Sequence, residues 1–428
     1  MRIIKLSDSQ IGNYIVIAFF CISLTPYLSA YLPNAILQLI LYISICGLML
    51  AYTQRTSLIH LKGRIDDQLF WVLLAVYIPM LGIRLYVDFI IIGREFFVFG
   101  SSFTILFVYM MQIVIPALFF RFYDFKINSR RIGYILAEIL CVCMILSINK
   151  ILNGDVEISD DGRFDNGYGI FAIEFGHYAI SLVLCSIVLL RSTKRFGVRL
   201  LLILSILIGF FASILAGSRG PYMALVICIG ILFIGKNRRK GRILKYVLIG
   251  ITLLPLCLYC LSVLSDVFAD LGFRSFERIY ESFFGGESLA NQTSGRDILY
   301  KEAMDYFSMS PVWGYSYLIP GKIYVHNILI EQFMALGIVG GCVFLVINIL
   351  ALRKAWDIIK NNPDFSLIPI LYIQYLIFGC FSSTIINLPQ YWLFLLLTMN
   401  HQVKDTSNVE SILYRRKIYV KENYKGAV

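Results

Sequence analysis

The stretch that decides the fold is NILIEQFMALGIVGGCVFLVINILAL, residues 327–352. Glu331 is its only charged residue, and its apolar residues follow one another without the alternation of a strand. A helix needs about 20 mostly apolar residues to cross the hydrocarbon of a bilayer. The stretch therefore predicts a membrane-spanning helix.

The whole chain has the same character. It has 428 residues, of which 58% are hydrophobic and 15% are charged, and its mean hydropathy is +0.75. Soluble domains are about 45–50% apolar and about 25% charged. A single core cannot hide so much apolar surface from water. The composition thus excludes a soluble enzyme, a disordered protein and a secreted disulfide scaffold.

Applied along the chain, the same length criterion predicts twelve spans. The first has no small-residue cleavage site after a short apolar stretch, so we interpret it as a retained helix and not a signal peptide. The predicted spans are 11–30, 34–53, 69–92, 102–120, 132–152, 168–190, 198–216, 221–235, 246–264, 327–352, 366–386 and 389–400.

Lys and Arg indicate the orientation through the positive-inside rule. With the N-terminus inside, most of the 38 Lys and Arg residues fall in inner segments. The expected protein is an all-α, polytopic integral membrane protein of about 12 transmembrane helices, with one membrane domain, 1–428, and both termini cytoplasmic. A large outer loop with short amphipathic helices, 265–325, separates the ninth and tenth spans, and 401–428 form a basic cytoplasmic tail. The net charge of +11 then records topology and not nucleic-acid binding.

The cysteines give no indication of a metal site. All ten lie inside predicted spans, so no disulfide crosslinks the long outer loop. Cys257 and Cys260 have CxxC spacing, but in lipid-embedded sequence we interpret them as packing residues. The chain has no second CxxC and no HExxH. We therefore expect no metal and no cofactor.

Glu174 and His177 lie three residues apart in the sixth span, so they share a helix face. A carboxylate inside a membrane is costly and indicates a functional site by default. One ExxH is weak evidence for a metal, because carboxylate-bridged sites need the motif twice. We interpret the pair as polar groups that line a site.

The most informative residues cluster at three outer helix entrances. The first is Gly217-Ser218-Arg219-Gly220-Pro221, between the seventh and eighth spans. Pro suits the first position of a helix, whose free N–H groups and dipole attract anions. Arg219 adds a permanent charge that can bind an anion in bidentate fashion. The alternative is a tight turn whose Arg reaches to lipid headgroups.

The second entrance is TSGRD, residues 293–297, in the long outer loop. Ser294 and Asp297 have capping-box spacing, and Pro311 forbids continuation of the helix they would start. Arg296 would then project from the first turn, beside free N–H groups. The alternative is a surface amphipathic helix with an N-terminal salt bridge.

The third entrance is Tyr324-Val325-His326-Asn327, which opens the tenth span. A neutral imidazole can take a proton from a hydroxyl at physiological pH. The alternative is a helix-start His that is bonded locally. Two arginines at anion-binding helix starts and one histidine together fit a bound pyrophosphate with a base nearby.

At these positions the chain resembles the O-antigen polymerase and O-antigen ligase superfamily of bacterial envelopes. The resemblance covers about 195–345 in its motifs and the remainder only in topology. The motifs are Gly217-Ser218-Arg219-Gly220, Ser294-Gly295-Arg296, Pro311-Val312-Trp313-Gly314-Tyr315, and His326-Asn327 followed by Gly337 and Gly340.

The resemblance implies a metal-independent, inverting glycosyltransferase acting on undecaprenyl-pyrophosphate glycans at the outer face of the bacterial cytoplasmic (inner) membrane. Arg219 and Arg296 would bind the donor pyrophosphate. His326 would be the general base, or alternatively a pyrophosphate ligand. The further residues expected to line the site are Ser218, Asn327, Glu331, Glu174 and His177.

Two activities in this superfamily share these motifs. A polymerase joins lipid-linked repeat units to each other, and a ligase transfers the finished chain to lipid A core or another acceptor. We favour a surface-polysaccharide (O-antigen or capsule) polymerase. Its expected partners are the lipid-linked donor and acceptor glycans, membrane lipid, a flippase and a chain-length regulator, with no nucleic acid. A twelve-span transporter or flippase is the rival class, and it would predict pseudo-repeated halves and broken helices.

Overall fold

The computed structural model describes residues 6–29, 31–56, 65–94, 101–123, 125–156, 164–236, 296–319, 321, 324–400 and 404–405. Its helices are α1 Asp8–Cys21, η1 Ile22–Leu28, α2 Asn34–Thr53, α3 Ile65–Tyr86, η2 Val87–Ile91, α4 Ser102–Tyr109, η3 Met110–Val114, α5 Ile115–Phe122, α6 Ser129–Leu152, α7 Ala172–Ser192, α8 Phe196–Leu215, α9 Arg219–Lys236, α13 Arg296–Met309, α14 Ile328–Asn361, η4 Pro363–Phe365, α15 Leu367–Ser382 and α16 Pro389–Met399. The strands described are two short segments that pair in parallel, β1 Lys126–Ile127 and β2 Lys404–Asp405.

The all-α, multi-span fold expected from the sequence is confirmed. Each predicted span within the described residues coincides with a helix or a run of joined helices. Eight of these, in the described part of the chain, are long and apolar enough to cross a membrane, while α9 and α15 are shorter apolar helices. The predicted span 246–264, most of the loop 265–325 and most of the tail 401–428 lie outside the described residues.

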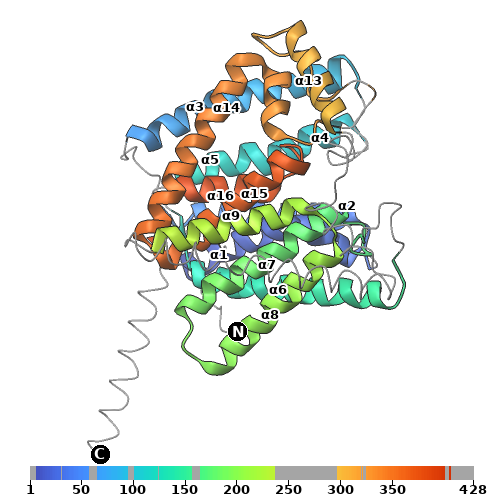
Figure 1. Ribbon diagram of the computed structural model, residues 1–428. Coiled ribbons are helices and arrows are strands. Elements are labelled where there is room, and N and C mark those ends of the chain that lie inside the picture. The colour runs from blue at the N-terminus through green and yellow to red at the C-terminus, as the bar shows by residue number, and fades with distance from the viewer. Residues whose placement is uncertain are drawn as a thin grey trace, which may run out of the picture.

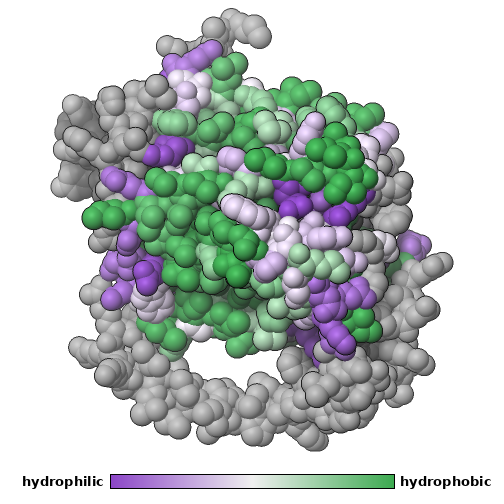
Figure 2. Space-filling view, turned by 90° about the horizontal axis from the view of Figure 1, so that it is seen from above, coloured by the Kyte–Doolittle hydropathy of each residue, from purple (hydrophilic) through white to green (hydrophobic). Residues whose placement is uncertain are grey.

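Two buried helices form the centre of the protein. Every residue of α16 is buried, as are most residues of α7, which packs against α6, α8, α9 and α15. By contrast, α2 and α8 present rows of exposed Leu, Ile and Phe. Figure 2 shows broad hydrophobic areas, interrupted by hydrophilic ones, on the face of the molecule that is seen from above. Such contiguous apolar surface suits contact with lipid and not with water.

The helix α14 is broken. Gly337 has φ +65° and ψ −165°, a conformation that is essentially restricted to glycine. The segment 311–315, Pro-Val-Trp-Gly-Tyr, fills the break: the Ile338 N–H donates to the Pro311 carbonyl (2.7 Å) and the Tyr315 N–H to the Met334 carbonyl (2.9 Å). These bonds satisfy backbone groups that the break releases, which is what allows a broken helix to persist in a membrane.

Figure 1 shows α14 lying beside α3, with α13 next to the first part of α14. The described part of α13 begins at Arg296, ends before Pro311 and buries Ala303. Its expected cap, Ser294, lies outside the described residues. Past the predicted end of the tenth span, α14 continues from 353 to Asn361. A hydropathy criterion ends where apolar residues end, whereas a helix can continue into water with polar residues.

Replacing Gly337 with Ala is expected to lower the thermal unfolding temperature of the purified protein strongly. A Cβ there would overlap the Val312 carbonyl, and the backbone conformation adds strain of about 1–3 kcal/mol. Differential scanning fluorimetry in detergent measures the shift. Gly47→Ala, in α2, is the matched control, because a Cβ at Gly47 meets nothing within 4 Å. Equal unfolding temperatures for the two variants would contradict this account of the break.

Candidate active site

The first turn of α14 is capped by the side chain of Asn327, the residue that precedes the helix. The Asn327 side chain accepts hydrogen bonds from the N–H groups of Leu329 (2.9 Å) and Ile330 (3.1 Å). Asn is among the preferred N-cap residues for this reason. The preceding residue, His326, has φ +60°, a left-handed conformation uncommon outside glycine. Asn327, expected to line the site, thus serves to fix the direction in which the His326 side chain leaves the backbone.

Arg296 and His326 meet at the C-terminal end of α15. Arg296 Nη1 donates to the Phe381 carbonyl (2.6 Å) and Nη2 to the Ser382 hydroxyl (3.1 Å). The imidazole of His326 donates to the Ser382 backbone carbonyl. Two residues that the sequence predicts separately therefore share one anchor, the partly negative end of a helix. The structure brings these two predicted site residues together.

We call the place where Arg296 and His326 meet the C-terminal end of α15 the α15 corner. The electrostatics of this corner favour a neutral imidazole. Burial and, to a smaller extent, the nearby Arg296 guanidinium lower the pKa of His326, the Ser382 bond raises it, and the net pKa is about 4. Among the described residues His326 Nδ1 has no hydrogen-bond partner. Since the ring donates to Ser382, the donating nitrogen is Nε2, and Nδ1 carries a free lone pair. That nitrogen can accept a proton.

Tyr324 covers the other side of the imidazole. The two ring centroids are 4.2 Å apart. Burial and the carboxylates of Glu174 and Glu331 raise the pKa of Tyr324, Arg296 lowers it, and the net pKa is about 12. Tyr324 therefore stays protonated at physiological pH and lies within electrostatic reach of α7, α13 and α14.

The entrance of α9 packs on the same corner from the side of α7. A Cβ at Gly220 would lie 3.6 Å from Nε2 of His177, and one at Gly176 would touch the Pro221 ring at 2.8 Å. The His177 ring in turn stacks on Phe378 of α15, with centroids 4.2 Å apart. Phe378 lies about one turn before Ser382. The segment with Arg219 and the pair Arg296 and His326 thus flank the same end of α15.

The local start of α9 differs from the prediction. Pro221 was expected at the first helical position, but the helix begins at Arg219 and Pro221 is the third residue. None of the N–H groups in a first turn has a partner within the helix, so Pro is tolerated there at more than one position. Ser218 is buried just before the helix, and Arg219 is half-buried.

The two carboxylates that are expected to line the site have different surroundings. Glu174 accepts a hydrogen bond from the Tyr178 hydroxyl in the first turn of α7. Glu331 is fully buried: its Oε1 accepts from the Ile385 N–H (3.1 Å) and from Nε2 of Gln332 (3.0 Å). Glu331 therefore links the first turn of α14 to the connection between α15 and α16, next to the site.

Sequence reasoning missed a buried ion cluster that holds the 311–318 segment. Asp88 is fully buried, lies 3.3 Å from Arg94 and 3.7 Å from Arg84, and accepts from the Tyr317 N–H (2.6 Å). Arg84 donates to three successive carbonyls, those of Trp313, Gly314 and Tyr315. The only signal in the sequence was an acidic residue flanked by two arginines at the end of an apolar span.

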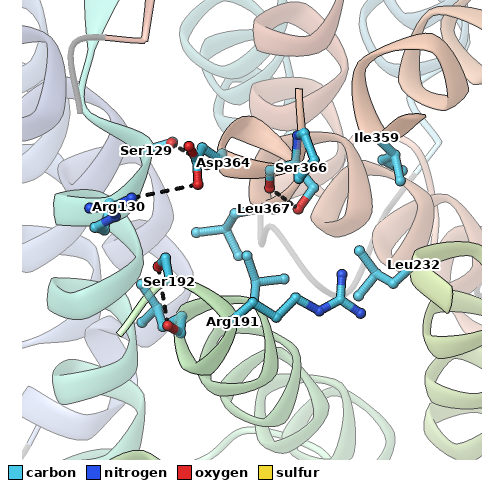
Figure 3. A pocket seen from close by; sticks show the side chains of 12 residues that line it. Ser129, Arg130, Arg191, Ser192, Leu232, Ile359, Asp364, Ser366 and Leu367 are labelled. Atoms are coloured by element: carbon cyan, nitrogen blue, oxygen red, sulfur yellow. Dashed lines mark hydrogen bonds and ion pairs between the residues drawn. The ribbon is translucent and has the colours of Figure 1, made fainter. Parts of the chain in front are cut away.

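A partly open pocket of about 180 Å³ lies at the opposite ends of α7 and α15. Figure 3 shows Arg130 facing Asp364, 3.5 Å away, on one wall, and the Arg191 side chain extending toward Leu232. The wall residues come from the end of α7, the start of α6 and the turn before α15. The pocket therefore lies far from the corner that gathers the predicted site residues.

The fold is that of a polytopic membrane protein. At the α15 corner, Arg296 and the neutral His326 meet at the end of one helix, and Arg219 lies beside them at the start of another. Residues 203–345 match a family model described as O-antigen ligase. The match includes Arg219, Arg296 and His326, and it confirms the resemblance to the O-antigen polymerase and ligase superfamily. No curated protein matches the chain.

The family match supports an enzyme of polysaccharide synthesis, of ligase or polymerase type, acting on lipid-linked glycans in a bacterial membrane. The matched range contains the segment with Arg219 and the segments with Arg296 and His326, which lie on the two sides of the α15 corner. The choice between the two activities, and the roles of single residues, are matters for proposal.

Proposed function

We propose that the protein is a surface-polysaccharide polymerase that joins undecaprenyl-pyrophosphate-linked repeat units at the outer face of the cytoplasmic membrane. The observation that carries the proposal is the convergence of Arg296 and His326 on Ser382, with the Arg219 entrance packed on the same helix end. Both termini lie in the cytoplasm in this proposal, so the corner faces the exterior.

The chemistry is a single displacement. The acceptor hydroxyl attacks the anomeric carbon of the donor sugar, the bond from that carbon to the pyrophosphate oxygen breaks, and the electron pair leaves with undecaprenyl pyrophosphate. The hydroxyl proton passes to Nδ1 of His326. Arg219 and Arg296 stabilise the charge that develops on the leaving pyrophosphate. One displacement inverts the anomeric configuration.

Burial strengthens the arginine contribution. Desolvation lowers the pKa of Arg296, and Tyr300 and Tyr324 act in the opposite direction. A charge held away from water interacts more strongly with a developing anion than one at the surface. The guanidinium also needs little reorganisation, because Phe381 and Ser382 already orient it. These two features suit a cationic clamp that works without a metal.

The break in α14 is the observation that favours the rival class, because transporters use broken helices to bind substrate and ions. Here, however, the released backbone groups bond to Pro311 and Tyr315 of the same chain. The break is thus occupied by protein. We therefore retain polymerase as the proposed function, with ligase as the alternative within the superfamily.

Deleting the gene in its host and separating the envelope glycans on a gel tests the function. Loss of a polymerase leaves glycan capped by a single repeat unit. Loss of a ligase removes attached glycan while lipid-linked polymer accumulates. Glycan of normal length and amount in the deletion strain would contradict both enzyme activities.

The pH dependence of the purified enzyme follows from His326. Its pKa in the folded protein is about 4, below the ordinary value of 6.5. The lone pair of Nδ1 is therefore available down to about pH 4 and is lost as the pH falls through that value. We expect kcat/KM for the donor to stay nearly level from pH 7 to about pH 5 and to fall below it. An acid limb centred near pH 6.5 would contradict this environment for His326.

A further inference from the structure

His177 is a buried polar side chain without a partner. Its exposed fraction is 0%, and among the described residues neither Nδ1 nor Nε2 has a hydrogen-bond partner. Leaving a buried donor or acceptor unsatisfied destabilises the folded protein. The backbone of the same residue is well used, because its carbonyl accepts from Gln374 (2.7 Å) and Ser181 (3.0 Å). The unsatisfied groups are confined to the ring.

The ring is oriented toward the entrance of α9. Phe378 stacks on it, so its plane is fixed. Apart from the chain neighbours of Gly220 and the backbone of α9, the atom of the described residues that comes within 4 Å of a Cβ on Gly220 is Nε2 of His177. Gly220 is half-buried and is the second residue of an 18-residue helix. Because residue 220 is a glycine, the imidazole edge faces the backbone of the first turn of α9, with no side chain of residue 220 beside it.

The first turn of α9 is a place that stabilises an anion. The first-turn N–H groups of α9 lack partners within the helix, and the helix dipole is positive at this end. Arg219, adjacent to Gly220, brings a guanidinium to the same turn. An imidazole N–H is a further donor that matches an anionic oxygen in such a place.

We propose that His177 donates a hydrogen bond from Nε2 to a phosphate oxygen of the lipid-linked pyrophosphate, on the side of the ring that faces Gly220. The inference rests on the proposed function and adds a donor from α7 to the two arginines. In this arrangement the buried nitrogen becomes accessible when the pyrophosphate binds at the first turn of α9, and a side chain at residue 220 would contact the nitrogen and compete with the phosphate oxygen. His177 and Gly220 thereby form a phosphate subsite between α7 and α9.

Binding of undecaprenyl pyrophosphate to the purified full-length protein in nanodiscs tests the subsite. His177→Phe keeps the aromatic packing on Phe378 and removes the donor. Gly220→Ala leaves His177 in place and adds a methyl group at ordinary contact distance from Nε2. We expect each to weaken binding by about 10- to 100-fold, the range for a lost hydrogen bond to a charged group. His177→Gln, which keeps an amide donor, should lose only a few-fold.

Two controls define the outcome. Gly230→Ala, on the same helix, should bind like wild type, because a Cβ at Gly230 would meet no atom of the described residues within 4 Å. Undecaprenol, which lacks the phosphates, should bind all variants equally. If His177→Phe unfolds, Gly220→Ala decides the question alone. The arginine variants Arg219→Ala and Arg296→Ala should weaken binding. If they do, and Gly220→Ala or a folded His177→Phe still binds with wild-type affinity, the subsite is overturned. Unchanged binding in the two arginine variants instead contradicts the proposed function.

Discussion

Arg296→Ala is expected to abolish chain elongation, lowering kcat/KM for the lipid-linked donor by about 10²- to 10³-fold or more. That is the usual cost of removing one group that stabilises charge in a transition state. Arg296→Lys should recover part of the rate, because it keeps the charge but loses the two-nitrogen geometry. Radiolabelled donor turnover by purified protein measures both variants.

Arg296 also holds the end of α15, so a structural effect must be separated from a catalytic one. Ser382→Ala removes the hydroxyl that Nη2 contacts and leaves the charge in place. We expect it to cost less than about tenfold in rate. Arg130→Ala, which breaks the ion pair with Asp364 at the opposite end of the helix bundle, serves as the matched arginine control. A folded Arg296→Ala variant with wild-type chain lengths would remove Arg296 from the site.

Replacing His326 should cost about 10²- to 10⁴-fold in kcat, the contribution typical of a general base. Because His326 has φ +60°, His326→Ala would add backbone strain to the loss of the ring. His326→Asn and His326→Gly avoid this, since both residues tolerate the left-handed region. We expect both to fold and both to be nearly inactive in the same turnover assay.

The neighbouring cap supplies the control for this experiment. Asn327→Ser keeps an oxygen that can accept from the first turn of α14, so activity and unfolding temperature should stay close to wild type. Asn327→Ala should lower the free energy of unfolding by about 1 kcal/mol. If His326→Gly folds and elongates glycan at the wild-type rate, His326 has no role in proton transfer.

The positions of the spans could be predicted from the sequence because a bilayer imposes one length on every helix that crosses it. The span predicted at 34–53 agrees with α2 at both ends. The break at Gly337 could not be predicted in this way, since glycine does not lower hydropathy enough to interrupt a span. Its signal is structural: Gly337 needs the φ value and Gly314 needs the space, and each is visible only once the 311–315 segment is seen in the break.

The candidate site was predictable in its charged residues and not in its anchors. Arg219, Arg296 and His326 stand out because polar groups at helix entrances of an apolar chain are few. Phe381 and Ser382, which bind Arg296, carry no such signal, and their role arises from the tertiary contact between the first residue of α13 and the end of α15. The unpartnered state of the His177 ring likewise depends on Phe378 and Gly220, which are distant in sequence.

The central claim is that two arginines and a histidine transfer a glycan from a lipid pyrophosphate without a metal. Reconstituting the purified protein in vesicles with undecaprenyl-pyrophosphate-linked repeat units and excess EDTA tests it most directly. The predicted result is a ladder of lengthened lipid-linked glycan, with one undecaprenyl pyrophosphate released per unit added, and no ladder with Arg296→Ala or His326→Gly. A ladder that appears only when a divalent cation is added, or an intact donor after incubation with folded wild-type protein, would contradict the claim.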